Sequence, residues 1–523
     1  MREFEDIIAV LAISLVISVV GGVLLAWVLR RRGLRWTWAL LGLPAAVVLS
    51  GSGPVVFWTL VWSSLLACGL GAHWHRMDLH EGVDHAEAAH RRIGITTVIR
   101  RVWERQRISR WGWLHEGRLI VGRDPRGLAV SIPVGFESGS HMLVLGATGS
   151  GKTVTEAWIT GRLIEAGHGA VVIDPKGDPL LADELEATAA RAGKAFLAWT
   201  PQGRLAYNPY ANGSDSEIAD KALSGERYSE PHYLRQAQRY LGHAVRSMHA
   251  AGVAVTPVSL MAHMNPRELE VTARQLPEAD AAQVQAYLDS LGERQRRELA
   301  GIRDRLSILA ESELRDQLNP TEGNRLDVHQ AVAERAVVYF RLDADRWPLL
   351  AQMLAAAIVG DLISLVARMQ ARPTPTLVVI DEFSATAAEQ VSRLFGRARS
   401  AGVSLLLATQ ELADLQTVGD GALREQTLGN VETVIAHRQN VPESAELIAA
   451  MAGTRPAWVT TQQTEEALIG IAPSGRGTRR RGYEFHTHPS HIKQLPTGHA
   501  TIITPGTRRP TSALIHHPRE TRL

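Results

Sequence analysis

The feature that most constrains this chain is a glycine-rich loop placed between a short apolar run and a helical pattern. Residues 141–153 read HMLVLGATGSGKT, and their last eight residues match the phosphate-binding loop pattern: Gly146, Ala147, Thr148, Gly149, Ser150, Gly151, Lys152 and Thr153. Glycines let backbone amides surround a phosphate, and the positive end of the following helix faces the same anion. The sequence therefore predicts an α/β fold with a buried parallel strand before the loop.

The residue types at the end of this loop predict ATP and Mg²⁺ as ligands. Lys152 is expected to reach the β- and γ-phosphates, and the Thr153 hydroxyl is expected to bind Mg²⁺. The basic charge is almost entirely arginine, because the only lysines are Lys152, Lys176, Lys194, Lys221 and Lys493. Because lysine is rare in this chain, a lysine inside a motif is less readily explained by chance.

An acidic pair supplies the second half of the predicted site. Residues 376–383 read TLVVIDEF, so an unbroken apolar run precedes Asp381 and Glu382. Such a run is typical of a parallel strand covered on both faces, and ligands bind at the carboxyl ends of such strands. Asp381 is expected to hold Mg²⁺, and Glu382 to orient or deprotonate the attacking water. The alternative is an acidic pair that merely ends a strand.

Four further positions are weaker candidates. Gln410 follows the apolar run 403–408 and is expected to contact the γ-phosphate or the water. Arg399 is chosen among Arg393, Arg397 and Arg399 as a residue that enters a neighbouring subunit's site, against the alternative of a solvated helix face. Asp174 and Lys176, in VVIDPKGD, are expected beside the site, although a plain strand-to-turn exit explains them equally well.

The N-terminal region is expected to cross a membrane. Residues 7–29 carry no charge and precede Arg30, Arg31 and Arg32, which favours a cytoplasmic flank and an anchor over a cleaved signal peptide. A second apolar region, 36–74, is broken around Pro54 and indicates two shorter passes or a re-entrant hairpin. An external N-terminus with three crossings is the simplest topology, and two crossings remain open.

The remaining segments carry less specific signals. The Arg- and His-rich connector 75–110 fits a solvated helix face better than contact with lipid head groups. The net charge is only +2, so DNA contact is expected from local patches directed at the backbone. A glycine-punctuated basic loop is a candidate for such a patch, and a flexible surface loop explains it equally well; its residues are Arg476, Arg479, Arg480 and Arg481. A histidine cluster lacks partners for a metal site; its residues are His486, His488 and His491. Cys68 alone excludes an internal disulfide.

The order of these motifs resembles the coupling proteins of type IV secretion systems, the TraG/TraD-like branch of the FtsK/HerA ATPases. The matching residues lie within 119–505 and read HMLVLGATGSGKT, VVIDPKGD, Tyr207-Asn208-Pro209-Tyr210, VYFRLDAD, VVIDEF and LLLATQ. The resemblance implies a RecA-like P-loop ATPase sheet with an all-α insert, preceded by transmembrane helices and assembled as a homo-hexamer around DNA. The arginine cluster after the first span departs from the family's usual two-span plan.

Pattern and resemblance together predict six segments. They are a transmembrane region (1–74), a juxtamembrane connector (75–118), a first motor part (119–213), an all-α insert (214–335), a second motor part (336–506) and a basic tail (507–523).

The expected function is a multi-pass ATPase of the bacterial inner membrane with a cytoplasmic motor. It is expected to translocate DNA and deliver a nucleoprotein substrate, with its relaxase and accessory proteins, to a conjugation channel. An FtsK-like DNA pump and a protein-export ATPase are the alternatives within this class. A substrate-recruiting receptor with little ATP turnover is the alternative from another class.

Overall fold

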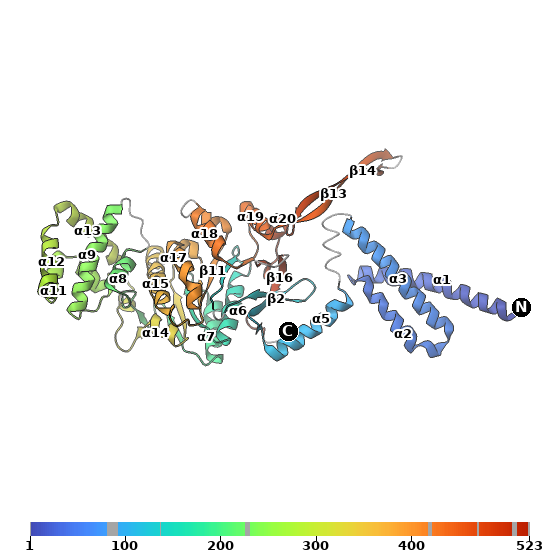
Figure 1. Ribbon diagram of the computed structural model, residues 1–523, viewed down its shortest axis with the longest axis horizontal. Coiled ribbons are helices and arrows are strands. Elements are labelled where there is room, and N and C mark those ends of the chain that lie inside the picture. Colours follow the sequence, from blue (N-terminus) through green and yellow to red (C-terminus); the bar gives the residue numbers. More distant parts are fainter. Residues whose placement is uncertain are drawn as a thin grey trace.

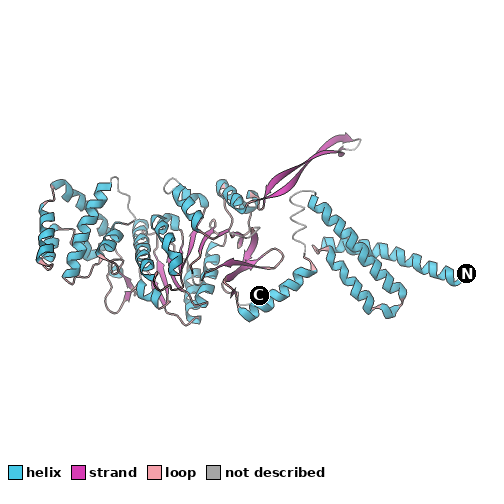
Figure 2. Ribbon diagram, viewed as in Figure 1, coloured by secondary structure: helices cyan, strands magenta, loops and turns pink. Residues whose placement is uncertain are grey.

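A 12-stranded sheet forms the centre of the chain (Figures 1 and 2). The computed structural model describes residues 2–80, 93–135, 138–224, 231–386, 388–416, 421–467, 470–504 and 510–520. Seven parallel strands lie in the order β12 (Thr433–Ala436), β4 (His141–Leu145), β11 (Val403–Thr409), β10 (Thr376–Ile380), β5 (Gly169–Asp174), β9 (Val337–Arg341) and β6 (Phe196–Trp199). Every residue of β4, β5, β10 and β11 is buried, which explains their continuous apolar sequences.

An antiparallel extension continues the sheet beyond β12. It consists of β15 (His499–Ile503), β16 (Thr511–Ile515), β2 (Arg118–Arg123), β1 (Leu114–His115) and β3 (Ala129–Pro133). The sequence analysis assigned residues 507–523 to a basic tail, and this assignment is wrong for β16. That strand pairs with both β15 and β2 and so belongs to the motor sheet.

Helices cover both faces of the sheet, as the predicted fold class requires. One face packs against α6 (Lys152–Glu165) and α7 (Pro179–Arg191), and its core includes Met142, Val144 and Trp158. The other face packs against α15 (Pro348–Met369), α17 (Ala388–Ala398), α18 (Ala422–Asn430) and α19 (Pro442–Ala452). Shorter helices are α14 (Val328–Ala333), α16 (Phe383–Thr386) and α20 (Pro489–Lys493).

A helical unit is inserted between β7 (Ala206–Tyr207) and β8 (Arg325–Leu326), which pair in parallel. It contains α8 (Asp215–Leu223), α9 (Pro231–Ala250), α10 (Pro257–Ala262), α11 (Pro266–Ala273), α12 (Glu278–Asp289) and α13 (Glu293–Ala310). Proline opens α10 and α11, where its missing N–H costs no helical hydrogen bond. The separate core of this insert ends at Leu306, whereas Leu309 and Leu314 already pack into the core of the sheet.

The N-terminal region contains two long apolar helices, α1 (Arg2–Arg31) and α3 (Pro54–His80). Between them lies a shorter apolar segment, residues 36–48, formed by a 3-10 turn and α2 (Gly42–Val48). Within the described residues, 14–31 and 54–77 are long enough to cross a bilayer, whereas 36–48 falls short of the ~17–25 residues that a spanning helix needs. Helices α1 and α3 run parallel, because Ser14 lies beside Thr59 and Arg30 beside Trp74. The chain between them, residues 32–53, therefore runs back along both helices, which fits the predicted three crossings with a short middle pass better than a re-entrant hairpin. Helix α15 is also long and apolar enough to cross a bilayer, but most of its residues are buried in the motor core.

A ribbon of β13 (Thr454–Ala467) and β14 (Gly470–Phe485) projects from the motor (Figure 1). The segment containing Arg476, Arg479, Arg480 and Arg481 was predicted as a loop, and this prediction is wrong because all four residues belong to β14. Arg479, Arg480 and Arg481 pair with the opposite strand at residues 458–460.

A buried charge connects the insert to the motor. Asp361 of α15 is fully buried and contacts the ammonium of Lys221 from α8 at 3.1 Å. It also lies 3.1 Å from His329 Nε2, and its other oxygen accepts a hydrogen bond from the Tyr207 hydroxyl at 3.2 Å.

Asp361→Ala is expected to destabilise the chain strongly, because it leaves Lys221 buried without its counter-charge. Breaking such a buried pair costs about 3–5 kcal/mol, whereas removing both charges costs far less. The thermal midpoint of the full chain in detergent should fall clearly below that of the exposed control Asp304→Ala, and Lys221→Met combined with Asp361→Leu should recover most of the loss. Equal midpoints for the two alanine variants would contradict this role of Asp361.

Candidate active site

The glycine-rich loop connects the carboxyl end of β4 to the start of α6. Gly149 (φ +73°) and Gly151 (φ +109°) adopt the left-handed backbone conformation that the predicted loop requires. A side chain at Gly146 would also be blocked, because an added Cβ would lie 2.4 Å from Ser150 Oγ. Helix α6 begins at Lys152, so its unpaired amides face the concave side of the loop.

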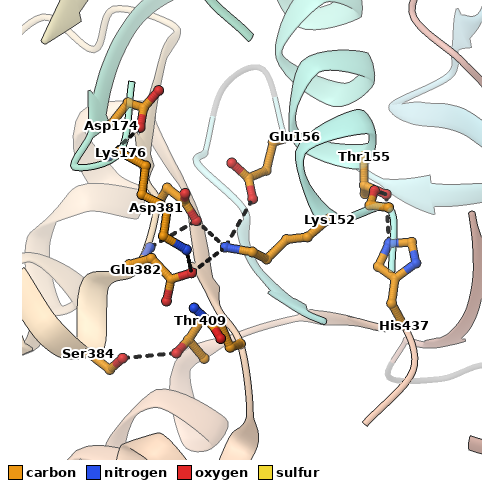
Figure 3. A network of polar contacts seen from close by, with 12 residues as sticks. Lys152, Thr155, Glu156, Asp174, Lys176, Asp381, Glu382, Ser384, Thr409 and His437 are labelled. Carbon is orange, nitrogen blue, oxygen red and sulfur yellow. Dashed lines mark hydrogen bonds and ion pairs between the residues drawn. The ribbon is translucent and has the colours of Figure 1, made fainter. Parts of the chain in front are cut away.

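Lys152 is brought together with the acidic pair predicted from TLVVIDEF (Figure 3). Its ammonium donates to Asp381 Oδ1 and lies 3.0 Å from Glu382 Oε1. All three residues are more than 90% buried. Burial alone would lower the pKa of Lys152, but Glu156, Asp381 and Glu382 together raise that pKa above its usual value. Lys152 is therefore held firmly in its charged form.

Glu382 has a strained backbone conformation. Its φ of +46° lies in the left-handed region that residues with a side chain rarely adopt. Besides Lys152, its Oε1 atom contacts the ammonium of Lys176 at 2.8 Å. Burial favours the neutral acid, yet Lys152 and Lys176 outweigh it and lower the pKa of Glu382. The carboxylate is thus ionised and fixed beside Lys152.

The DPKG turn after β5 positions Lys176. Asp174 accepts hydrogen bonds from the backbone N–H groups of Lys176 (2.9 Å), Gly177 (2.7 Å) and Asp178 (2.8 Å), and from the Tyr339 hydroxyl (2.8 Å). The structure therefore places Asp174 and Lys176 beside the acidic pair, in agreement with the sequence reading that put them at this edge.

Glu156 was missed by the sequence analysis. It lies one helical turn after Lys152 in α6, and its Oε1 is 4.0 Å from the Lys152 ammonium. Within the described part of the chain, neither of its buried carboxyl oxygens has a hydrogen-bond partner. Burial and the nearby Asp381 raise its pKa well above the usual value, despite the opposing effect of Lys152. The spacing of four residues from Lys152 was the signal that could have found it.

The remaining predicted residues occupy different places. Thr153 lies in the first turn of α6, half-buried. Gln410 follows β11, and its backbone oxygen accepts a hydrogen bond from the Gly146 N–H at 3.1 Å, so it adjoins the loop. Arg399 precedes β11 and therefore lies at the amino ends of the parallel strands, away from the phosphate-binding loop. Its guanidinium donates there to the Asn430 carbonyl at 2.7 Å. It cannot serve the site of its own chain.

Residues near the C-terminal end of the chain form hydrogen bonds to the phosphate-binding loop, which the sequence did not predict. The Gly498 N–H donates to the Ser150 carbonyl (2.8 Å), and the Thr497 hydroxyl donates to the Gly149 carbonyl (3.1 Å). His437, at the end of β12, lies 2.8 Å from the Thr155 hydroxyl, and burial lowers its pKa to about 4. A neutral imidazole therefore fills the space beside the loop.

These residues fit a nucleotide with a magnesium ion. The loop offers backbone amides to phosphates, and Thr153 and Asp381 offer oxygen atoms of the kind that Mg²⁺ prefers. A parallel sheet with this loop on one strand and an acidic pair on another is the arrangement of the P-loop ATPase class.

Comparisons with known proteins specify this class further. Residues 116–314 match the family model of the central domain of helicase HerA, and residues 375–496 match the model described as the TraM recognition site of TraD and TraG. No curated protein matches the chain in sequence.

Solved structures share the fold at low sequence identity. The bacterial conjugative coupling protein TrwBdeltaN70 in its unbound form has a TM-score of 0.53 and 16% identity, over 79% of this chain and 91% of that one. TrwB with a non-hydrolysable GTP analogue has a TM-score of 0.50 and 16% identity, over 73% and 88%. VirB4 of Thermoanaerobacter pseudethanolicus has a TM-score of 0.50 and 14% identity, over 77% and 97%. The chain is thus similar to conjugative coupling proteins of the P-loop ATPase class, which confirms the predicted resemblance and fold.

Glu156→Gln is expected to change how stability depends on pH. Because the fold favours the protonated acid, the stability linked to Glu156 is present below the usual pKa of about 4.5 and is lost as the pH rises through the raised pKa of the folded state. Glutamine carries no such proton, so the thermal midpoint of the variant relative to the unchanged chain should rise with pH above this value. Melting curves from pH 4 to pH 9 test this, with the exposed Glu186→Gln as control. A constant difference across that range would refute the burial argument.

Proposed function

We propose that this coupling-type ATPase binds ATP with Mg²⁺, hydrolyses it, and uses the cycle to translocate DNA. The observation that carries the proposal is the buried contact of Lys152 with Asp381 and Glu382. It joins the phosphate-binding lysine to the two carboxylates that a hydrolytic site needs. The related TrwB structure with a bound GTP analogue supports a triphosphate as the ligand.

The side chains would divide the chemical work as follows. Lys152 exchanges its carboxylate contacts for the β- and γ-phosphates, while Thr153 and Asp381 hold Mg²⁺. The ion, when bound, draws charge from the phosphate oxygens. Glu382 would then be free of Lys152 and would orient the attacking water. Its contact with Lys176, 2.8 Å in the structure, would remain. Gln410 follows the neighbouring strand and would sense the terminal phosphate.

The position of Arg399 supports a ring of subunits. Because Arg399 lies at the amino ends of the strands and Lys152 at their carboxyl ends, Arg399 can complete only the site of a neighbouring chain. An arginine supplied in this way is worth about 10³–10⁵ in rate. A homo-hexamer around DNA, as the family resemblance implies, provides such a neighbour for every site.

The proposed setting is the bacterial inner membrane, with α1 and α3 as anchors and the motor in the cytoplasm. Arg30 and Arg31 end α1 and Arg32 follows it, and these three charges favour that orientation. The partners would be a conjugation channel and a relaxase with accessory proteins. DNA would be held through its phosphates, which suits a motor that releases its track at each step.

Glu382→Gln is expected to lower ATP turnover by about 10²–10⁴-fold, because an amide cannot accept the proton of the attacking water. ATP binding should persist, since Lys152 and the loop are unchanged. Turnover and equilibrium binding of a fluorescent ATP analogue, measured on the full chain, test this. The exposed Glu443→Gln serves as control. Unchanged turnover would remove Glu382 from the mechanism.

DNA of any sequence is expected to stimulate ATP turnover by the full chain in lipid nanodiscs. Stimulation should fall as salt rises, because phosphate contacts release counterions. Turnover at several salt concentrations, with single- and double-stranded DNA of unrelated sequences, measures this. A rate that DNA leaves unchanged, together with normal DNA transfer by Glu382→Gln cells, would favour the substrate-recruiting receptor.

A further inference from the structure

Helix α5 (Ile95–Trp111) links the membrane region to the motor and has two distinct faces. Its inner face contacts the β2–β3 hairpin. Arg101 Nε donates to the Arg126 carbonyl at 2.6 Å, and the Glu104 carboxylate accepts from the Ala129 N–H at 2.9 Å. Thr97 and Ile108 lie on the same side and are buried. The motor sheet therefore covers this face and supplies its hydrogen-bond partners.

The outer face of α5 exposes large apolar side chains. Ile99, Val102 and Trp103 are 52%, 49% and 70% exposed, and their spacing of three and four residues places them on one stripe. Within the part of the chain that the structure describes, nothing covers this stripe. The cost of leaving such side chains in water calls for a partner.

The charges beside this stripe are almost all positive. Helix α5 contains Arg100, Arg101, Arg105, Arg107 and Arg110, and its one acidic residue is Glu104. Glu104 is already engaged by Arg100 at 3.0 Å and by the Ala129 N–H. An apolar stripe flanked by arginines is complementary to the head-group region of an anionic membrane. It is a poor match for the same face of a second chain, whose arginines would repel it.

The start of α5 is fastened to the cytoplasmic end of the membrane helices. Leu34 forms a β-bridge with Ile93, the Arg35 N–H donates to the Ile93 carbonyl at 2.8 Å, and Trp38 Nε1 donates to the same oxygen at 2.7 Å. Trp103 lies only ~12 Å along the helix from Ile95. In Figure 1, α5 leaves the end of α1 and α3 obliquely, between these helices and the sheet. The first turns of α5 are thus held next to the expected membrane surface.

We propose that the outer face of α5, formed by Ile99, Val102 and Trp103, docks onto the anionic surface of the membrane that α1 and α3 anchor. The inference rests on the proposed membrane anchoring and departs from the sequence-based preference for a solvated face in this connector. The inner face of α5 remains on the β2–β3 hairpin, so docking fixes the height and tilt of the motor sheet above the bilayer. The flanking Arg100 and Arg107, which contact Glu104 at 3.0 Å and Glu116 at 3.4 Å in the structure, exchange these exposed ion pairs for lipid phosphates.

Fluorescence of the full chain in nanodiscs tests this proposal. Ile99→Cys in a Cys68→Ser background carries a polarity-sensitive label, and Trp103 is retained. Val271→Cys, at a residue that is 59% exposed on α11 of the insert, is the matched control position. With phosphatidylglycerol present, the label at position 99 should shift to the blue and be quenched by lipids with brominated acyl chains, and the label at position 271 should do neither. Adding Trp103→Ser should reduce both effects at position 99.

Three outcomes would overturn the proposal. They are identical spectra at positions 99 and 271, an equal response in pure phosphatidylcholine, and a response lost when each disc holds a single chain, which would assign the stripe to a second copy. A label on the natural Cys68 of α3 reports anchoring independently. Quenching there without quenching at position 99 refutes docking alone, whereas its absence at both positions refutes the anchoring itself.

Discussion

The contact between Lys152 and the acidic pair is the constraint on which the rest of this molecule depends. One ammonium faces the Asp381 and Glu382 carboxylates in a buried site, with the carboxyl group of Glu156 4.0 Å away. A triphosphate that takes Lys152 would leave these carboxylates facing phosphate oxygens. A divalent cation held by Asp381 and Thr153 would offset this excess of negative charge. The proposed need for Mg²⁺ therefore follows from the charges already present, and not from the loop motif alone.

This constraint also accounts for what the sequence could predict. The central strands are buried on both faces, so they read as apolar runs, and each motif lies directly after such a run. Because parallel strands end at one edge of a sheet, Lys152, Asp381 and Gln410 could be placed together before any coordinates. Lys176 could be placed at that edge too, but its contact with Glu382 depends on the conformation of a turn.

Other features depend on long-range packing that leaves no local pattern. Glu156 resembles any polar residue of an amphipathic helix until α6 is buried against the sheet. β16 is a short strand next to a basic, proline-containing end, and its pairing with β2 joins residues almost 400 positions apart in sequence. The stripe on α5 looked like part of a solvated helix because its arginines dominate the composition. Its apolar members are recognised only once the inner face is known to be occupied.

The antiparallel extension gives the C-terminal part of the chain a mechanical role. It connects α5, through β3, β2, β16 and β15, to the turn where Gly498 contacts Ser150 of the phosphate loop. Contacts in series do not by themselves couple two sites, because coupling needs an element with two arrangements that both sites favour differently. Lys152 is such an element, since it contacts carboxylates here and would contact phosphates in the proposed ATP-bound form. The phosphate loop contacts Thr497 and Gly498, which precede β15. A change in the contacts of Lys152 would therefore act on β15 through these residues. In the proposed cycle, this route joins the phosphate loop to the side of the sheet that carries α5.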